Sequence, residues 1–101
     1  MTKCYMVAEI IVSDSETFYS GYMPRVKPLL KLFEASVVIA TNEVVRLEGE
    51  LSFSRFLVLE FSSRDKAMEF YESPEYKEIA VLRFKSATTN LFLADAHKHS
   101  F

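Results

Sequence analysis

The chain has 101 residues, half of them hydrophobic, and a formal net charge of −2. This length supports one domain with a core of its own, and the hydrophobic content excludes a disordered chain. Acidic and basic residues are interspersed and no uninterrupted apolar run reaches the length of a membrane span, so we expect neither a nucleic-acid partner nor a membrane segment.

The first predicted element is a strand over residues 4–12. Its side chains alternate between two faces, one with Met6, Ala8, Ile10 and Val12 and the other with Tyr5, Val7, Glu9 and Ile11. The residues before it lack the apolar core of a secretory signal, and a lone Cys4 cannot form an internal disulfide. Both observations are typical of a protein of the reducing cytoplasm.

A helix start signal follows this strand, because Ser13 and Glu16 have the spacing of a capping box and Asp14 is an equally good cap. The next apolar residues keep helical spacing over two prolines, Pro24 and Pro28. Each proline removes a backbone donor and crowds the preceding turn. We therefore expect a kink or a break near residues 22–25.

Two further strands are predicted in the middle of the chain. Residues 36–41 are short and β-branched, and residues 56–61 form a nearly continuous apolar run. The second run places Leu57, Leu59 and Phe61 on one face and Phe56, Val58 and Glu60 on the other. Residues 44–50 between them are interpreted as a strand extension or a hairpin arm that ends at Gly49.

Serine residues then mark two helix starts. Ser62 or Ser63 supplies an N-cap for a helix that begins near Arg64. Ser73 and Pro74 end that helix and begin a second, short one, because proline lacks a donor and fits the first helical position.

The last strand is predicted over residues 87–93, so the order of elements is β-α-β-β-α-β over residues 1–95, with a polar tail over residues 96–101. This order is typical of the ferredoxin-like α+β fold, an antiparallel four-stranded sheet with its helices on one face. The other face carries apolar side chains such as Val7 and Phe56 and is too apolar to stay in water. We therefore predict a homodimer in which two open sheet faces meet.

Several segments resemble one family. They are Tyr5 with Ala8-Glu9-Ile10, Asp14, Leu47-Glu48-Gly49, Arg55 with the strand up to Ser63, and Tyr71-Glu72-Ser73-Pro74-Glu75-Tyr76 with Arg83. Together they are similar to domain-of-unknown-function family 1330 (DUF1330) of the dimeric α+β barrel superfamily, over nearly the whole chain. The resemblance implies a homodimer and offers no established activity.

The chain also departs from the pattern of that family. Glu34-Ala35 replaces the usual Gly-Gly between the first helix and the second strand, so the turn should be built differently. Ser62 replaces the usual proline before the second helix, and Pro24 is an addition.

Two glutamates are candidates for catalysis, because Glu9 and Glu60 fall on the same predicted face of neighbouring strands. Two carboxylates close together in a dry cavity would raise one pKa and create an acid/base pair. In the commoner arrangement, each glutamate pairs with an arginine such as Arg46, Arg55 or Arg83, or lies at a wet rim.

The candidate ligand-binding residues are Arg55, Arg83, Tyr22, Tyr71 and Tyr76. An arginine can hold a ligand carboxylate with its fork of donors, or tie a loop or helix end to the sheet. The tyrosines can line a small pocket between helix and sheet, or form aromatic core with each hydroxyl reaching water. The superfamily resembled includes cofactor-free monooxygenases and isomerases with such pockets, which is an analogy of fold.

The remaining reactive residues are expected to be inert. His97 and His99 have a spacing that can bind a metal but lack a third ligand nearby, so they indicate a solvated tail. Cys4 lies in an apolar strand without a neighbouring base, which favours a buried thiol. With no Gly-rich phosphate loop, nucleophile elbow or metal-spaced cysteines, we expect no cofactor and no metal.

Two functions follow from these patterns. The first is a homodimer that binds a small organic molecule by the sheet, in its finer form a cofactor-independent monooxygenase or isomerase acting on an organic acid or aromatic compound. The second is a non-catalytic dimeric structural or interaction module. A cavity that persists beside the sheet favours the first, and a filled core favours the second.

Overall fold

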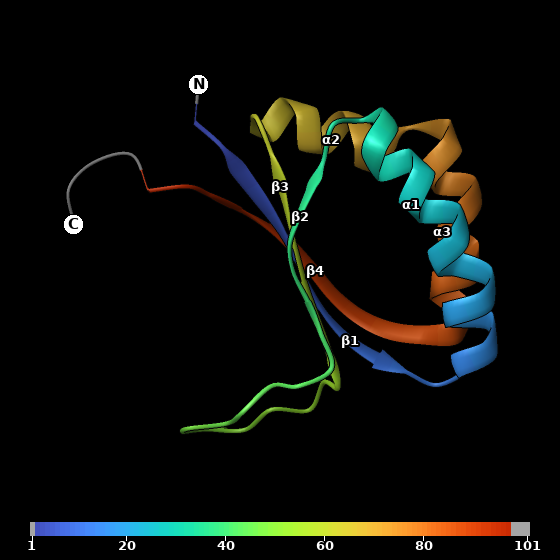
Figure 1. Cartoon of the computed structure of the whole chain (residues 1–101), viewed down its shortest axis with the longest axis vertical. Coiled ribbons are helices and arrows are strands. Elements are labelled where there is room, and N and C mark those ends of the chain that lie inside the picture. Colours follow the sequence, from blue (N-terminus) through green and yellow to red (C-terminus); the bar gives the residue numbers. More distant parts are fainter. Residues whose placement is uncertain (1, 98–101) are drawn as a thin grey trace.

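The computed structural model describes residues 2–97, in which one antiparallel sheet carries all of its helices on one face (Figure 1). The elements in chain order are β1 (Cys4–Val12), η1 (Thr17–Tyr22), α1 (Met23–Leu32), β2 (Ser36–Thr41), β3 (Arg55–Phe61), α2 (Arg64–Glu72), α3 (Pro74–Ser86) and β4 (Ala87–Asp95). The strand order across the sheet is β2-β3-β1-β4. The predicted ferredoxin-like α+β fold is confirmed.

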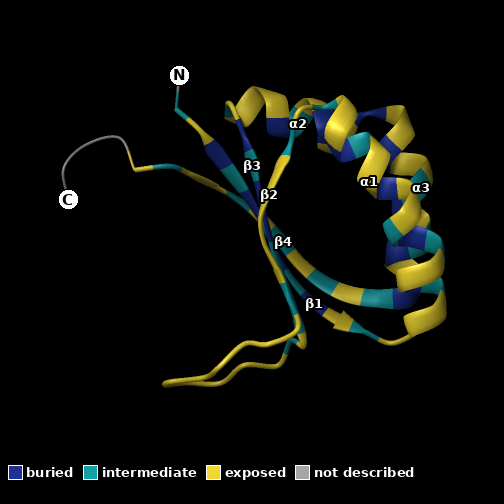
Figure 2. Cartoon of the chain, in the orientation of Figure 1, coloured by how far each residue is buried: buried dark blue, intermediate teal, exposed yellow. Residues whose placement is uncertain are grey.

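Strand pairing decides which side chains share a face of the sheet. β1 lies between β3 and β4, and both pairings are antiparallel. Three rows across these strands face the helices: Leu59, Met6 and Leu93; Leu57, Ala8 and Leu91; and Arg55, Ile10 and Thr89. The β1 members of these rows are buried, whereas their neighbours on the opposite face remain partly or fully exposed (Figure 2). The alternation predicted for β1 is therefore correct.

β2 contains an irregularity in its pairing with β3. Val37 lies opposite Leu59 and Ile39 lies opposite Val58, so Val38 is an extra residue in the ladder. Because of this bulge, Val37 and Ala40 both face the helices although they are three residues apart.

The first helical segment is capped by Asp14. Its carboxylate accepts hydrogen bonds from the Thr17 N–H at 3.1 Å and from the Thr17 hydroxyl at 2.6 Å. These bonds hold the pKa of Asp14 below its ordinary value. Of the two caps that the sequence offered, the structure has Asp14 and not Ser13.

The interruption predicted near residues 22–25 is a change of helix type and not a break. η1 is a π-helix that ends at Tyr22, and α1 begins at Met23 with Pro24 in its first turn. The Met23 N–H bonds the Phe18 carbonyl, five residues back. The donor that Pro24 lacks therefore falls at the junction, where the hydrogen-bond pattern changes in any case.

α1 ends in a Schellman turn. The Glu34 N–H bonds the Lys31 carbonyl at 3.1 Å and the Ala35 N–H bonds the Leu30 carbonyl at 2.8 Å. Glu34 has a φ of 59°, the left-handed conformation that glycine adopts most easily. The expectation of a different turn is thus wrong: the backbone is the usual glycine turn, built with a glutamate.

Serine caps begin the two later helices. The Ser63 hydroxyl accepts from the Lys66 N–H at 3.2 Å, and the Ser73 hydroxyl accepts from the Tyr76 N–H at 3.1 Å. Ser63, and not Ser62, is therefore the first cap. The second helix, α3, is longer than predicted, with 13 residues against 9 in α2.

The connection between β2 and β3 is an arm. Of the two interpretations of residues 44–50, the strand extension is wrong, because residues 42–54 contain no strand, whereas an arm is present and projects from the sheet (Figure 1). The chain returns to the sheet at Ser54, whose N–H bonds the Ile10 carbonyl at 3.0 Å. Gly49 turns the arm with a φ of 80°. Two of its apolar side chains, Val45 and Leu47, are 82% and 90% exposed.

The C-terminal strand continues its pairing as far as the first residue of the predicted tail, where the Ala96 N–H bonds the Lys3 carbonyl at 2.8 Å. Residues 98–101 of that tail lie outside the described residues. No helix within residues 2–97 is long and apolar enough to cross a membrane.

Candidate functional site

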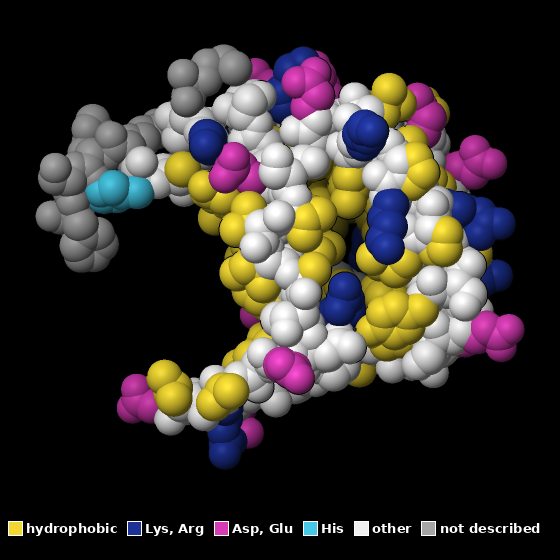
Figure 3. Space-filling view, viewed as in Figure 1, with side chains coloured by type: hydrophobic (Ala, Val, Ile, Leu, Met, Phe, Trp, Pro, Cys, Tyr) yellow, Lys and Arg dark blue, Asp and Glu magenta, His cyan; other side chains and the backbone are white. Residues whose placement is uncertain are grey.

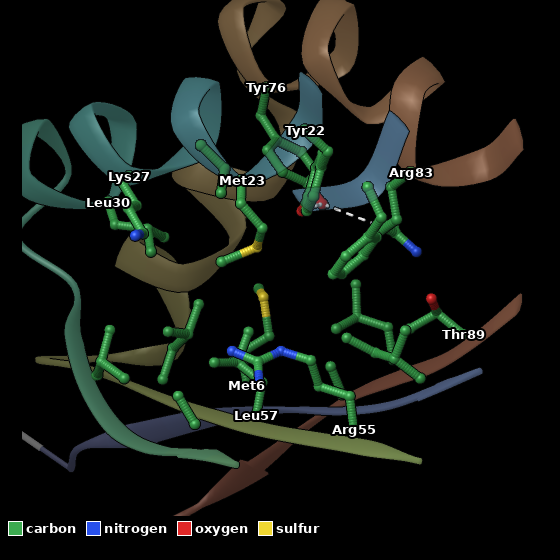
Figure 4. Close-up of a pocket in the computed structure, with 18 of the residues that line it drawn as sticks. Met6, Tyr22, Met23, Lys27, Leu30, Arg55, Leu57, Tyr76, Arg83 and Thr89 are labelled. Carbon is green, nitrogen blue, oxygen red and sulfur yellow. Dashed lines mark hydrogen bonds between the residues drawn. The ribbon is translucent and has the colours of Figure 1, made fainter. Parts of the chain in front are cut away.

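A cavity of about 350 Å³ lies between the helices and the sheet (Figure 4). In the space-filling view, the molecule is hollowed between these two layers, with hydrophobic side chains around the hollow and cationic side chains at its rim (Figure 3). The apolar part of its lining includes Met6, Ala8, Met23, Val26, Leu30, Leu57 and Leu91. Both the volume and the mainly apolar lining are typical of small-molecule sites.

Three polar side chains form a chain of hydrogen bonds at this cavity. Arg83 Nε donates to the Tyr76 hydroxyl oxygen at 3.2 Å, and the hydroxyls of Tyr76 and Tyr22 lie 2.9 Å apart. Tyr76 and Arg83 lie on one face of α3, seven residues apart, and Tyr22 reaches them from the end of η1. All three residues are buried. Burial raises the pKa of Tyr22 far above its ordinary value, so this phenol keeps its proton.

Arg83 is a buried cation, and only 7% of its surface is exposed. Within residues 2–97, no carboxylate forms an ion pair with it. Its guanidinium lies over the ring of Phe84, 4.9 Å from the ring centroid. Buried charges in proteins are normally paired, so the cavity carries a positive charge that the described part of the chain does not compensate.

Two further cations line the same cavity, Arg55 and Lys27. Arg55 donates to the Asn42 side-chain oxygen at 2.9 Å and lies over the Tyr19 ring at 5.8 Å, whereas Lys27 is exposed. No aspartate or glutamate is among the described residues that line the cavity. The site is therefore electropositive in a chain with a net charge of −2.

Thr89 is a lining residue that sequence reasoning missed. Its hydroxyl oxygen is buried, and within residues 2–97 it has no hydrogen-bond partner. It belongs to the same row of the sheet as Ile10 and Arg55. Once the face of one β4 residue is known, strand alternation places Thr89 on the helix-facing side. No sequence pattern predicts that its hydroxyl lacks a hydrogen-bond partner.

The structure does not bring the two candidate glutamates together. Glu60 lies opposite Tyr5 and Glu9 lies opposite Phe56. Four residues of strand separate these two positions, which is roughly 13 Å. Both face away from the helices, so neither lies in the cavity.

Each glutamate has a polar partner on that open face. Glu60 accepts a hydrogen bond from the Tyr5 hydroxyl at 3.0 Å and forms an ion pair with Lys3 at 3.2 Å. The bonds from Lys3 and then Tyr5 lower the pKa of Glu60, opposite to the rise that an acid/base pair requires. Glu9 accepts from the Asn90 amide at 3.4 Å. The predicted pairing with a cation occurs at Glu60, but with a lysine instead of an arginine.

Four of the five predicted ligand-binding residues meet at the cavity: Tyr22, Arg55, Tyr76 and Arg83. Tyr71 does not. It is 38% exposed and lines a second depression together with Met68 and Phe92. Its ring centroid is 5.9 Å from that of Tyr76.

Cys4 and the two C-terminal histidines lie away from the lining of this cavity or outside the described residues. Cys4 is fully buried, and burial raises the pKa of its thiol. His99 lies outside the described residues. Residues 2–97 contain no cluster of three His, Cys, Asp or Glu side chains placed to hold a metal.

The family model of the domain of unknown function DUF1330 matches residues 3–97. Among curated proteins, no match to this chain was found.

Solved structures share the fold at low identity. RPA0582, a protein of unknown function from Rhodopseudomonas palustris, has a TM-score of 0.78 at 17% identity, over 97% of this chain and 85% of its own. SnoaB, a cofactor-independent oxygenase from Streptomyces nogalater, has a TM-score of 0.62 at 14% identity, over 98% of this chain and 97% of its own. An ethyl tert-butyl ether d (ethd) family protein from Bacillus halodurans has a TM-score of 0.64 at 16% identity, over 96% of this chain and 100% of its own.

Proposed function

The chain belongs to the DUF1330 family, and we propose that it binds a small organic molecule in the cavity between its helices and its sheet. The observation that carries this proposal is the buried Arg83, hydrogen-bonded to Tyr76 inside a mainly apolar cavity of about 350 Å³. An apolar enclosure with a few convergent polar groups is the usual form of a ligand site. Arg55 and Tyr22 complete the polar lining.

We also propose that the chain acts as a homodimer through its open sheet face. That face exposes large apolar side chains, among them Phe92 at 47%, Ile11 at 41% and Ile39 at 40%. A contiguous apolar surface of this kind is normally covered, and a second copy of the same face is self-complementary about a two-fold axis. The arm over residues 42–54 projects on the same side and would extend the contact (Figure 1).

A finer proposal is a cofactor-independent enzyme of the monooxygenase or isomerase type. Its support is the fold shared with SnoaB, together with the hydroxyls of Tyr22 and Tyr76 held beside a cation in a mainly apolar cavity. Donors fixed in this way can stabilise negative charge that develops on a bound molecule.

The second candidate is a non-catalytic dimeric interaction module. The exposed apolar side chains of the arm, Val45 and Leu47, favour this candidate because they suit a protein surface better than a small molecule. The two candidates differ in whether the cavity is occupied.

Native mass spectrometry of the untagged protein separates them, because it reports the number of chains and any retained small molecule together. We expect a dimer with a reproducible added mass. The variant Ala8→Leu, which fills the cavity floor, should lose that mass while remaining a dimer. A bare dimer whose melting temperature no small organic compound raises would support the interaction module, and a monomer would contradict the dimer.

A further inference from the structure

We propose that the ligand of the cavity is an organic monocarboxylate, bound with its carboxylate beside Arg83 and Thr89 and with its apolar body over Ala8. This inference rests on the proposed function and specifies its ligand. Three independent features lead to it: the order of side chains on the cavity floor, the number of donors at one end, and the absence of a counter-charge for Arg83.

The floor of the cavity changes character along the strands. The first row across β3, β1 and β4 is Arg55, Ile10 and Thr89, and the next two rows are entirely apolar. Successive rows on one face are about 6.6 Å apart, so the apolar part runs for roughly 13 Å beyond the polar row. A molecule that fits this floor has a polar group at one end and an apolar body.

The helices, which form the opposite side of the cavity, place their polar groups over the row that contains Thr89. Arg83 stands three residues before the end of α3, and Thr89 is the third residue of β4, so both lie at the corner where helix passes into strand. Figure 4 shows them on one side of the cavity and Leu30 on the other, with the hydroxyls of Tyr22 and Tyr76 directed toward the Arg83 side. The polar ends of the cavity floor and of the helix side therefore coincide.

The hydrogen-bond pattern leaves donors to spare at this end. Tyr76 and Tyr22 carry two phenolic protons, and the bond between their oxygens uses one of them. Arg83 can only donate, and it already donates to the Tyr76 oxygen, so it accepts neither proton. Whichever tyrosine donates to the other, one phenolic O–H remains for a ligand, and the Thr89 hydroxyl is unbonded as well.

These donors and the charge of Arg83 select an anionic oxygen. A carboxylate accepts hydrogen bonds at both of its oxygens and neutralises the guanidinium, whereas an amide or an alcohol leaves that charge buried and unpaired. One buried cation matches a single negative charge. A dianion such as a phosphate ester would bring a second negative charge into the cavity, and the two other lining cations are not buried beside it, since Arg55 is only partly buried and Lys27 is exposed.

The size of the cavity bounds the apolar body. An apolar protein cavity of about 150 Å³ is enough to bind benzene. The cavity here is about 350 Å³, so it accommodates a one- or two-ring acid or a branched chain of similar bulk.

The test compares matched charged and neutral probes, sodium benzoate and 2-naphthoate against benzamide and 2-naphthamide, by isothermal titration calorimetry. We expect each carboxylate to bind at least about tenfold more tightly than its amide, because hydrogen bonds between charged groups are the stronger ones. In Arg83→Gln this preference should disappear. In Lys66→Gln, which removes an exposed cation that pairs with Glu69 on α2, it should persist.

A second variant tests the same proposal independently, in case Arg83→Gln does not fold. Thr89→Val keeps the shape of the side chain and removes one donor, so carboxylate affinity should fall about threefold or more. Equal affinity for acid and amide, or a preference that survives Arg83→Gln, would overturn the carboxylate assignment and leave the cavity as a site for neutral molecules. Failure of all four probes to bind at millimolar concentration would overturn both proposals together.

Discussion

The two faces of the sheet are both apolar, yet they hold their charges in opposite ways. On the face covered by helices, Arg83 is buried and has no carboxylate partner within residues 2–97. On the open face, Glu60 is ion-paired with Lys3 and hydrogen-bonded to Tyr5. An ion-paired charge is compensated within the fold, whereas a buried charge without a counter-charge is available to a charged ligand. This difference supports the proposals of a ligand site on the covered face and of a dimer contact on the open one.

The largest effect is expected where the open face would meet its partner. Phe92 lies opposite Val7 on that face and is 47% exposed. In Phe92→Glu, each of the two copies in a dimer loses about 0.7–1.5 kcal/mol, roughly half the value for full burial, because Phe92 is already about half buried. Each copy also brings a carboxylate into the contact, which costs several kcal/mol more, so the dissociation constant should rise at least about 100-fold. Analytical ultracentrifugation measures this directly.

The matched control for that change lies on the helix side. Leu32 in α1 is 67% exposed, and Leu32→Glu should leave the assembly unchanged. If Leu32→Glu dissociates the dimer and Phe92→Glu does not, the dimer forms through the helices and the contrast between the faces is reversed.

The next effect tests the unpaired charge of the covered face. Arg83→Met keeps the length and apolar packing of the side chain but removes the buried charge, so the ligand-free protein should become more stable by about 1–2 kcal/mol. Chemical denaturation measures the free energy of unfolding. Such a gain in stability with a loss of ligand binding is the usual relation at a functional site.

Arg64→Met is the control for Arg83→Met, because Arg64 is an exposed cation of α2 that pairs with Asp95. It should change the free energy of unfolding by about 0.5 kcal/mol or less. Destabilisation by Arg83→Met would identify Arg83 as a structural residue that holds the hydroxyls of Tyr76 in α3 and Tyr22 in η1 together, and would contradict its proposed role in ligand binding.

A smaller effect is expected at the turn that returns the chain from the helix layer to the sheet. Glu34 occupies the left-handed position of the Schellman turn, which costs a non-glycine residue about 1 kcal/mol. Glu34→Gly should therefore stabilise the fold by about 0.5–1 kcal/mol, as measured by thermal unfolding. Glu34→Ala should give no gain, since alanine is disfavoured there too. Equal gains from both would show that the charge of Glu34, and not its backbone, is unfavourable.

The smallest effect concerns the pH dependence of the open face. The pKa of Glu60 is lowered by Lys3 and then by Tyr5, so its carboxylate contributes stability above its unfolded pKa and loses that contribution as the pH falls through the lowered value. The stability difference between the wild type and Glu60→Gln should be constant above about pH 5 and should shrink below it. Denaturation at a series of pH values checks this, and a difference that grows in acid would mean that Glu60 is unfavourably placed.

The fold was largely predictable because its signals are local. Strand alternation around Met6, the Ser63 and Ser73 caps and the apolar run of β3 each depend on neighbouring residues only. The arm over residues 42–54 was less predictable, because its β-branched residues suit a strand but find no partner to pair with.

The site was predictable in part. Tyr22, Tyr76 and Arg83 meet because helical spacing and helix packing bring them together, and sequence reasoning did identify each of them. The separation of Glu9 and Glu60 depends on strand register, which no single strand encodes. Thr89 was missed for the same reason, since a threonine near a strand start is unremarkable until its neighbours across the sheet are known.

The bulge at Val38 also decides which side chains of β2 face the cavity and which face the open side of the sheet. With an uninterrupted ladder from Val37 onward, Ile39 would stand opposite Leu57 and fill part of the cavity, and Ala40 would stand opposite Phe56 on the outer surface. The extra residue exchanges them, so the small side chain of Ala40 borders the cavity and the bulky Ile39 joins the exposed apolar surface. One additional residue in an edge strand thus enlarges the room for a ligand and the area for a partner at the same time.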